Sequence, residues 1–190
     1  MTDTAPERLA IEYGNALDLI EAFDKPIDLL ATDPPYAFGE TVKEHALSAT
    51  VAVVLRECAA RVRRGGVAVV MCASSYRSIA YMVESVRGLL TPVRIGTWCK
   101  PESRTKVSTA GWRWASVSVI VFRKGKADMP TGDWLDHITA PTLKTGRRAQ
   151  VPSDVANWMI GPHVTPGGVM LDPFAGSGAL VRAAGDAGRS

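Results

Sequence analysis

The sequence has 190 residues, of which 46% are apolar and 22% charged, and a net charge of +3, which predicts one folded domain rather than a disordered chain. Three cysteines and three histidines are scattered without a CxxC pair, which argues against a disulfide framework and against a metal site. The N-terminus lacks the apolar segment of a signal peptide and no stretch reaches membrane-spanning length, so we expect a cytoplasmic protein without a membrane partner.

The first third of the chain predicts two strands and two helices. Residues 9–13 and 27–32 are apolar runs of strand length, and the second is nearly continuous, as in a buried parallel strand. Residues 16–23 predict one or two helical turns. A longer helix follows and ends at Gly65 and Gly66. Its apolar face is Leu47, Val51, Val54, Leu55, Cys58 and Val62, and its last turn carries Arg61, Arg63 and Arg64.

The middle of the chain predicts three more strands and one helix. The apolar runs at residues 67–72 and 93–98 predict central strands, and the alternation at residues 115–122 predicts another. Ser74 or Ser75 is suited to cap the helix that follows residue 72. The apolar face of that helix is Tyr76, Ile79, Val83, Val86 and Leu90.

The last part of the chain predicts a basic loop region at residues 99–150, set as a small insertion into the single domain. A helix through Trp158 and Met159 begins after Pro152, and a strand at residues 169–171 and a helix at 179–187 follow. Strands that alternate with helices predict an α/β fold with a largely parallel sheet and helices on both faces. Ligands of such sheets bind at the carboxyl ends of the strands.

The tetrapeptide Asp33-Pro34-Pro35-Tyr36 directly follows the strand at residues 27–32. Prolines fix φ and withhold backbone donors, so this turn is stiff and offers bare carbonyls beside the Asp33 carboxylate. Two adjacent acceptors suit an –NH2 group, and Tyr36 offers a flat face for an aromatic ring. The pattern is typical of a site for an amino group on a planar base, although a rigid capped turn uses the same residues.

A second motif, Asp172-Pro173-Phe174-Ala175-Gly176-Ser177-Gly178, follows the strand at residues 169–171. A glycine turn between a strand and a helix lets the backbone approach a ligand closely, although a tight packing turn has the same form. The chain has no GxxxxGK[ST] motif, and the glycine spacing is shorter than in the dinucleotide fingerprint. A nucleoside-type ligand without a pyrophosphate therefore fits better than a nucleotide.

Basic residues are concentrated between Arg94 and Lys126, where eight Lys/Arg accompany one acid, Glu102. Such a local excess can neutralise phosphates, although an ordinary solvated surface has the same composition.

The two motifs together resemble the S-adenosylmethionine-dependent DNA amino-methyltransferases, which modify adenine N6 or cytosine N4. The catalytic motif precedes the cofactor motif here, as in the permuted β group of that family. Weaker matches are Trp98-Cys99-Lys100-Pro101, Gln150-Val151-Pro152 in place of Gln-Lys-Pro, and Gly14-Asn15-Ala16 with Asn15 in place of an acid. The resemblance spans the whole chain and implies a Rossmann-like methyltransferase sheet.

The resemblance implies a role for each motif. Tyr36 would stack on a base flipped out of the duplex, while the Asp33 carboxylate and the Pro34 carbonyl accept its amine protons, and an initial Asp favours adenine. Asp172 would face the amino-acid end of S-adenosylmethionine. The implied cofactor-binding residues are Asp172, Pro173, Phe174, Gly176, Ser177, Gly178 and Asn15. The implied DNA-binding residues are Lys100, Arg104, Lys106 and Arg113, with Trp112 and Trp114 beside Arg113.

The family continues past the last helix into a strand that ends in an acid holding the ribose hydroxyls, whereas this sequence ends at Ser190. We therefore expect a gap inside the sheet, which closes up or is filled by a second copy or another chain. The alternative is a degenerate relative that binds DNA or a partner without methylating. Methylation of glutamine or of RNA adenine is disfavoured, because those enzymes usually carry Asn-Pro-Pro and place the cofactor motif first.

Overall fold

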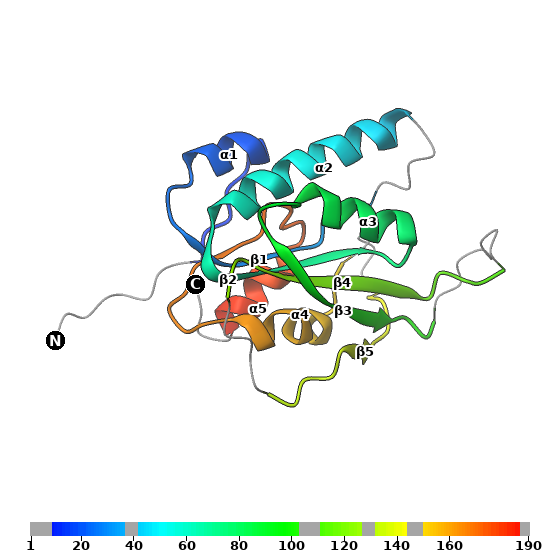
Figure 1. Cartoon of the computed structure of the whole chain (residues 1–190). Coiled ribbons are helices and arrows are strands. Elements are labelled where there is room, and N and C mark those ends of the chain that lie inside the picture. Colours follow the sequence, from blue (N-terminus) through cyan, green and yellow to red (C-terminus); the bar gives the residue numbers. More distant parts are fainter. Residues whose placement is uncertain (1–8, 37–41, 103–110, 127–131, 144–149, 187–190) are drawn as a thin grey trace.

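The computed structural model describes residues 9–36, 42–102, 111–126, 132–143 and 150–186. They form a six-stranded sheet in the order β5-β3-β4-β2-β1-β6, with helices on both faces (Figure 1). The strands are β1 (Ile27–Thr32), β2 (Val62–Ala73), β3 (Thr91–Cys99), β4 (Ser116–Arg123), β5 (His137–Thr139) and β6 (Met170–Leu171). The helices are α1 (Ala16–Ala22), α2 (Val42–Arg61), α3 (Tyr76–Ser85), α4 (Ser153–Ile160) and α5 (Ala179–Asp186), and η1 (Gly161–His163) is a 3-10 turn. The predicted α/β fold is confirmed.

The sheet is mixed rather than largely parallel. β1 is parallel to β2 and to β6, and β3 is parallel to β5. β4 is antiparallel to both of its neighbours, β2 and β3. The prediction missed this inversion, although the sequence between β3 and β4 has no helical periodicity and a parallel pair needs a crossover connection, usually a helix.

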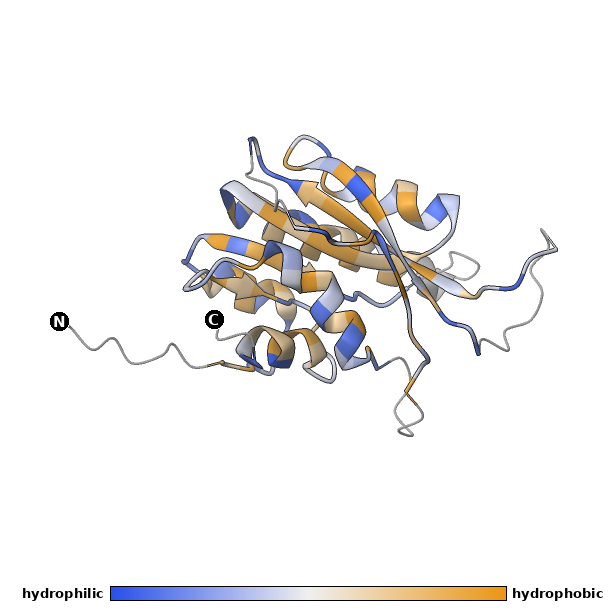
Figure 2. Cartoon of the chain, turned by 90° about the horizontal axis from the view of Figure 1, so that it is seen from below, coloured by the Kyte–Doolittle hydropathy of each residue, from blue (hydrophilic) through white to orange (hydrophobic). Residues whose placement is uncertain are grey.

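The core consists of two apolar layers, one on each face of the sheet. Successive side chains of a strand point to opposite faces, so in β1 Leu29 packs with α4 and α5, and Leu30 packs with α1, α2 and α3. The central strands are apolar along most of their length, whereas the helices mix polar and apolar residues (Figure 2). β4 is buried on both faces, so its serine positions do not mark an exposed side.

Helix α2 confirms most of its predicted apolar face but ends earlier than predicted. Val51, Val54, Leu55 and Cys58 are buried, whereas Leu47 is 39% exposed. β2 begins at Val62 directly after the helix, so Arg63 and Arg64 belong to the strand and not to the last helical turn.

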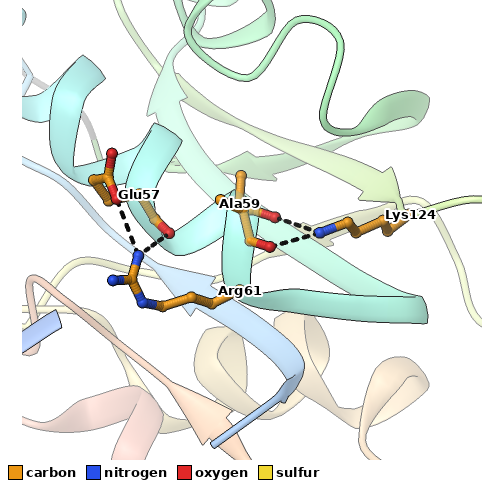
Figure 3. Close-up of polar contacts among 5 residues, drawn as sticks. Glu57, Ala59, Arg61 and Lys124 are labelled. Carbon is orange, nitrogen blue, oxygen red and sulfur yellow. Dashed lines mark hydrogen bonds and ion pairs between the residues drawn. The ribbon is translucent and has the colours of Figure 1, made fainter. Parts of the chain in front are cut away.

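The end of α2 is held by basic side chains (Figure 3). Lys124 Nζ donates to the carbonyl oxygens of Ala59 and Ala60 at 3.3 and 2.7 Å, and Arg61 Nη1 donates to the Glu57 carbonyl at 2.9 Å. The last carbonyls of a helix have no intrahelical partner, so Lys124 stabilises this terminus.

Residues 9–13 do not form the predicted strand. Leu9 Cδ1 lies so close to Gly185 that a Cβ there would collide with it, and a Cβ at Gly178 would lie 3.5 Å from Ile11 Cδ1. The segment therefore runs along α5 instead of pairing with a strand. In the part of the chain that the structure describes, β6 is an edge strand, so the expected gap inside the sheet is not found.

Four smaller predictions were tested by the structure. Ser75 caps α3 through a 3.1 Å hydrogen bond from the Ser78 N–H, as predicted. Tyr76 is 91% exposed, so its assignment to the apolar face of that helix was wrong. β3 is next to the edge strand β5 and its first half is exposed, so it is not central. β5 itself lies in a region predicted to be irregular.

The described helices include none that is long and apolar enough to cross a membrane. Within the same described residues, no group of three or more His, Cys, Asp or Glu side chains is arranged to hold a metal ion.

Candidate functional site

Both sequence motifs line one cavity of about 1140 Å³. Leu30 of β1 is paired in parallel with Leu171 of β6, so the loops that follow these strands leave the same edge of the sheet. Most of the predicted catalytic and cofactor-binding residues line the cavity: Asp33, Pro34, Pro35, Tyr36, Asp172, Pro173, Phe174, Gly176 and Ser177. The remaining walls are residues 9–14, parts of α1 and the start of α5.

Asp33 and Tyr36 interact within the first motif. The Tyr36 hydroxyl donates a hydrogen bond to Asp33 Oδ1. Burial raises the pKa of Asp33, while this hydrogen bond and the Lys100 ammonium oppose the rise. Burial, followed by the charge of Asp33, raises the pKa of Tyr36 well above its usual value, so Tyr36 is a neutral donor. The bond fixes the orientation of the carboxylate at the cavity wall.

Asp172 links the second motif to the first. Thr32 Oγ1 donates to Asp172 Oδ1 at 2.7 Å, and the Phe174 N–H donates to the same oxygen at 3.1 Å. Burial raises the pKa of Asp172 to about 6, which these two hydrogen bonds partly oppose. Thr32 directly precedes Asp33, so this contact fixes the two loops relative to each other.

The turn after Phe174 depends on glycine. Gly176 and Gly178 have φ of +53° and +74°, a backbone region that residues with a Cβ rarely adopt. The Gly178 N–H donates to the Ala175 carbonyl at 2.6 Å, and Arg182 Nη1 of α5 donates to the Ser177 carbonyl at 2.5 Å. The turn is therefore tight and anchored to the helix that follows it. Gly178 is buried and does not itself line the cavity.

Asn15 does not line the cavity either. Its side-chain oxygen accepts a 3.0 Å hydrogen bond from the Leu17 N–H, and its carbonyl accepts one from the Leu19 N–H at 3.1 Å. Asn15 is thus the N-cap of α1, which is a structural use of this residue type.

The predicted DNA-binding residues are only partly described. Lys100 Nζ lies 4.4 Å from the centroid of the Trp98 ring, and burial lowers the pKa of Lys100, while the charge of Asp33 opposes this. Arg113 and Trp112 are exposed, Trp112 to 82%, shortly before β4 begins at Ser116. Arg104 and Lys106 lie outside the described residues.

The basic stretch does not form one surface. Arg123 and Lys124 lie at the opposite end of β4 from Arg113, and Lys124 caps α2. Arg94 is paired with Asp136 at 3.7 Å. A charge count along the sequence could not separate these uses, since they depend on the direction of each strand.

Two features of the site were missed by the sequence analysis. Thr32 was assigned to a strand, and its contact with Asp172 joins residues 140 positions apart. Residues 9–14 were assigned to a strand and a turn, yet they form a cavity wall that includes Glu12. The position of Thr32 directly before the first motif was the available signal.

No protein-family model matches the chain, and no curated protein is similar to it in sequence. Several solved structures share its fold. M1.HpyAVI, in a complex with S-adenosylmethionine, has a TM-score of 0.75 and 20% identity over 95% of this chain and 89% of that chain. TTHA0409 from Thermus thermophilus, described as a DNA modification methylase, has a TM-score of 0.67 and 20% identity over 93% of this chain and 83% of that chain.

A further structural match is PvuII DNA methyltransferase, which is cytosine-N4-specific. It has a TM-score of 0.70 and 16% identity over 93% of this chain and 78% of that chain. The chain therefore has the fold of DNA methyltransferases.

Proposed function

We propose that this chain transfers a methyl group from S-adenosylmethionine to the exocyclic amine of a flipped DNA base, with adenine N6 as the favoured acceptor. The observation that carries the proposal is the single cavity lined by both Asp33–Tyr36 and the loop from Asp172 to Ser177. The fold shared with DNA methyltransferases supports it.

The cavity suits S-adenosylmethionine in size and charge. Ligand pockets are commonly about 300–1,000 Å³, so the cavity has room for a nucleoside cofactor and part of a base. Among the described residues that line it, Lys25 is the one lysine or arginine, which is consistent with a ligand that carries no phosphate. Phe174 and the turn at Gly176 would hold the adenosine part, and Asp172 the amino-acid end.

The first motif would bind and orient the target amine. The Asp33 carboxylate and the Pro34 carbonyl would each accept one amine proton, and Tyr36 would stack on the ring. Holding both protons turns the nitrogen lone pair out of the ring plane. Bound S-adenosylmethionine would supply an electrophilic methyl group, whose transfer to nitrogen breaks its bond to sulfur and leaves a neutral thioether. The methylated nitrogen would then release one of its two protons. Positioning and charge fixed in advance would provide the rate enhancement.

The choice of adenine rests on the initial Asp of the first motif, which resembles the adenine-N6 enzymes more than the cytosine-N4 enzymes. DNA would approach over the β3–β4 connection, since the Lys100 charge interacts with Asp33 and since Arg113 and Trp112 are exposed before β4. Arg104 and Lys106 belong to the same connection and would contact phosphates.

A second candidate is a relative that binds DNA or a partner without methylating. One observation favours it: Asn15, which replaces the expected acid, caps α1 and does not line the cavity. Titration calorimetry with S-adenosylmethionine separates the candidates, because the second predicts no heat of binding at millimolar cofactor.

The proposed role of Asp33 is tested with Asp33→Ala and the control Asp18→Ala, which changes an exposed carboxylate of α1 outside the cavity. We expect both variants to bind S-adenosylmethionine within about twofold of wild type. Transfer of labelled methyl to DNA should fall by roughly 100-fold or more in Asp33→Ala alone, as when a preorganised transition-state contact is lost. Undiminished transfer by Asp33→Ala would remove Asp33 from the mechanism.

A further inference from the structure

The segment of residues 9–14 brings one carboxylate to the cofactor end of the cavity. Leu9 lies against Gly185 near the end of α5, and Ile11 lies against Gly178 directly before its start. The segment therefore runs antiparallel to α5, towards the loop that begins at Asp172. Glu12 follows Ile11, is exposed and lines the cavity.

Four carboxylates line the cavity among the described residues, namely Glu12, Asp24, Asp33 and Asp172. Asp33 accepts a hydrogen bond from Tyr36, and Asp172 accepts two through one oxygen. Both of these carboxylates belong to the motif loops. The other two are available as acceptors for a further part of a ligand.

Asp24 and Glu12 lie at different ends of the cavity. Asp24 precedes the first residue of β1, whereas Asp33 follows the last one, and a strand of six residues spans about 20 Å. Asp24 is thus at the amino end of β1, away from the motif loops. Glu12 is next to the residue that contacts Gly178, so it is at the loop end.

We propose that Glu12 accepts the hydrogen bonds of the ribose hydroxyls of the nucleoside cofactor, an inference that rests on the proposed function. A vicinal diol offers two donors, and a carboxylate offers two acceptor oxygens that can take both. Carboxylates bind ribose hydroxyls in the same way in dinucleotide-binding folds. Residues 9–14, which line the cavity instead of forming the predicted strand, thereby contribute the ribose-binding carboxylate.

The experiment uses S-adenosylhomocysteine and its 2′-deoxy analogue as probes in titration calorimetry. The variants are Glu12→Gln, the control Glu21→Gln on the exposed side of α1 outside the cavity, and Asp24→Asn as the rival carboxylate. Glu12→Gln should weaken binding of the ribonucleoside roughly 10-fold, the usual effect of losing a charged hydrogen bond. Glu21→Gln and Asp24→Asn should bind as wild type does.

The 2′-deoxy analogue distinguishes the loss of a contact to the ribose from a general weakening of cofactor binding. Wild type should bind the 2′-deoxy analogue roughly 10-fold more weakly. Glu12→Gln should weaken binding of the analogue less than binding of the ribonucleoside, because the contact to the 2′ hydroxyl is already absent and only the contact to the 3′ hydroxyl is left to lose. Losses that multiply, or a Glu12→Gln variant that binds as wild type does, would overturn the assignment of Glu12. Failure of wild type to bind either probe would instead contradict the proposed function itself.

Discussion

At the scale of single residues, Asp172 is the carboxylate whose environment has the clearest consequence. It lies half-buried directly after β6 and accepts hydrogen bonds from Thr32 and from the Phe174 N–H. Burial dominates, so its pKa is raised from 3.8 to about 6. The folded protein therefore binds a proton at Asp172 more tightly than the unfolded chain does.

This difference predicts a pH-dependent stability. Because the folded state holds the extra proton between pH 3.8 and about 6, the free energy of unfolding contributed by Asp172 falls as the pH rises through that window. Each pKa unit corresponds to about 1.4 kcal/mol, so the loss by pH 7 is on the order of 3 kcal/mol. Asp172→Asn keeps the acceptor oxygen and lacks the ionisation.

Urea unfolding at pH 4 and pH 7 measures this effect. We expect wild type to lose stability relative to Asp172→Asn as the pH is raised. Parallel pH profiles of the two proteins would show that the Asp172 carboxyl has the same pKa in the folded and unfolded states.

At the scale of elements, helix α2 offers a direct test of which face is buried. Leu55 is fully buried, whereas Leu47, two turns earlier, is 39% exposed although the sequence pattern places both on one face. Leu55→Ala should cost roughly 2–5 kcal/mol of unfolding free energy, because it removes buried methyl groups and leaves a cavity. Leu47→Ala should cost less than about 1 kcal/mol.

Denaturant unfolding of both variants gives the comparison, with each serving as the control for the other. Equal losses would mean that Leu47 is packed as fully as Leu55, which would contradict the packing of α2 described above.

Elements with strong periodicity could be predicted from the sequence, and elements that depend on partners could not. β1, β2 and β4 are long apolar runs, and the Ser75 cap of α3 is a local hydrogen bond. β5 has three residues and forms only because β3 lies beside it. Residues 9–13 have a strand-like pattern, yet Leu9 packs against Gly185 of α5 and Ile11 against Gly178, which precedes that helix.

The candidate site shows the same division. The two motifs could be found from the sequence because stiff proline and glycine turns directly follow apolar runs. Their contact through Thr32 could not, since it depends on which strands are neighbours and in which register. The basic residues that are close in sequence lie at different places in the fold because the strands run in different directions. Lys124 caps the end of α2, whereas the Lys100 charge interacts with Asp33.

At the scale of the whole molecule, the order of strands explains how distant motifs share one cavity. β1 lies between β2 and β6, and both β1 and β6 end at the same edge. The N-terminal segment and α1 close the cavity along the other side. Arg113 and Trp112 are exposed shortly before β4 begins at Ser116, so they belong to the connection that follows Lys100 in the chain and not to the wall of the cavity.

The most direct test of this account is mass spectrometry of nucleosides from DNA incubated with the protein and S-adenosylmethionine. We predict N6-methyldeoxyadenosine with wild type and none above background with Asp33→Ala. N4-methyldeoxycytidine in its place would retain the methyl transfer and correct the base. Absence of any methylated nucleoside, from a protein shown to bind the cofactor and DNA, would contradict the claim that this cavity joins a methyl donor to a flipped base.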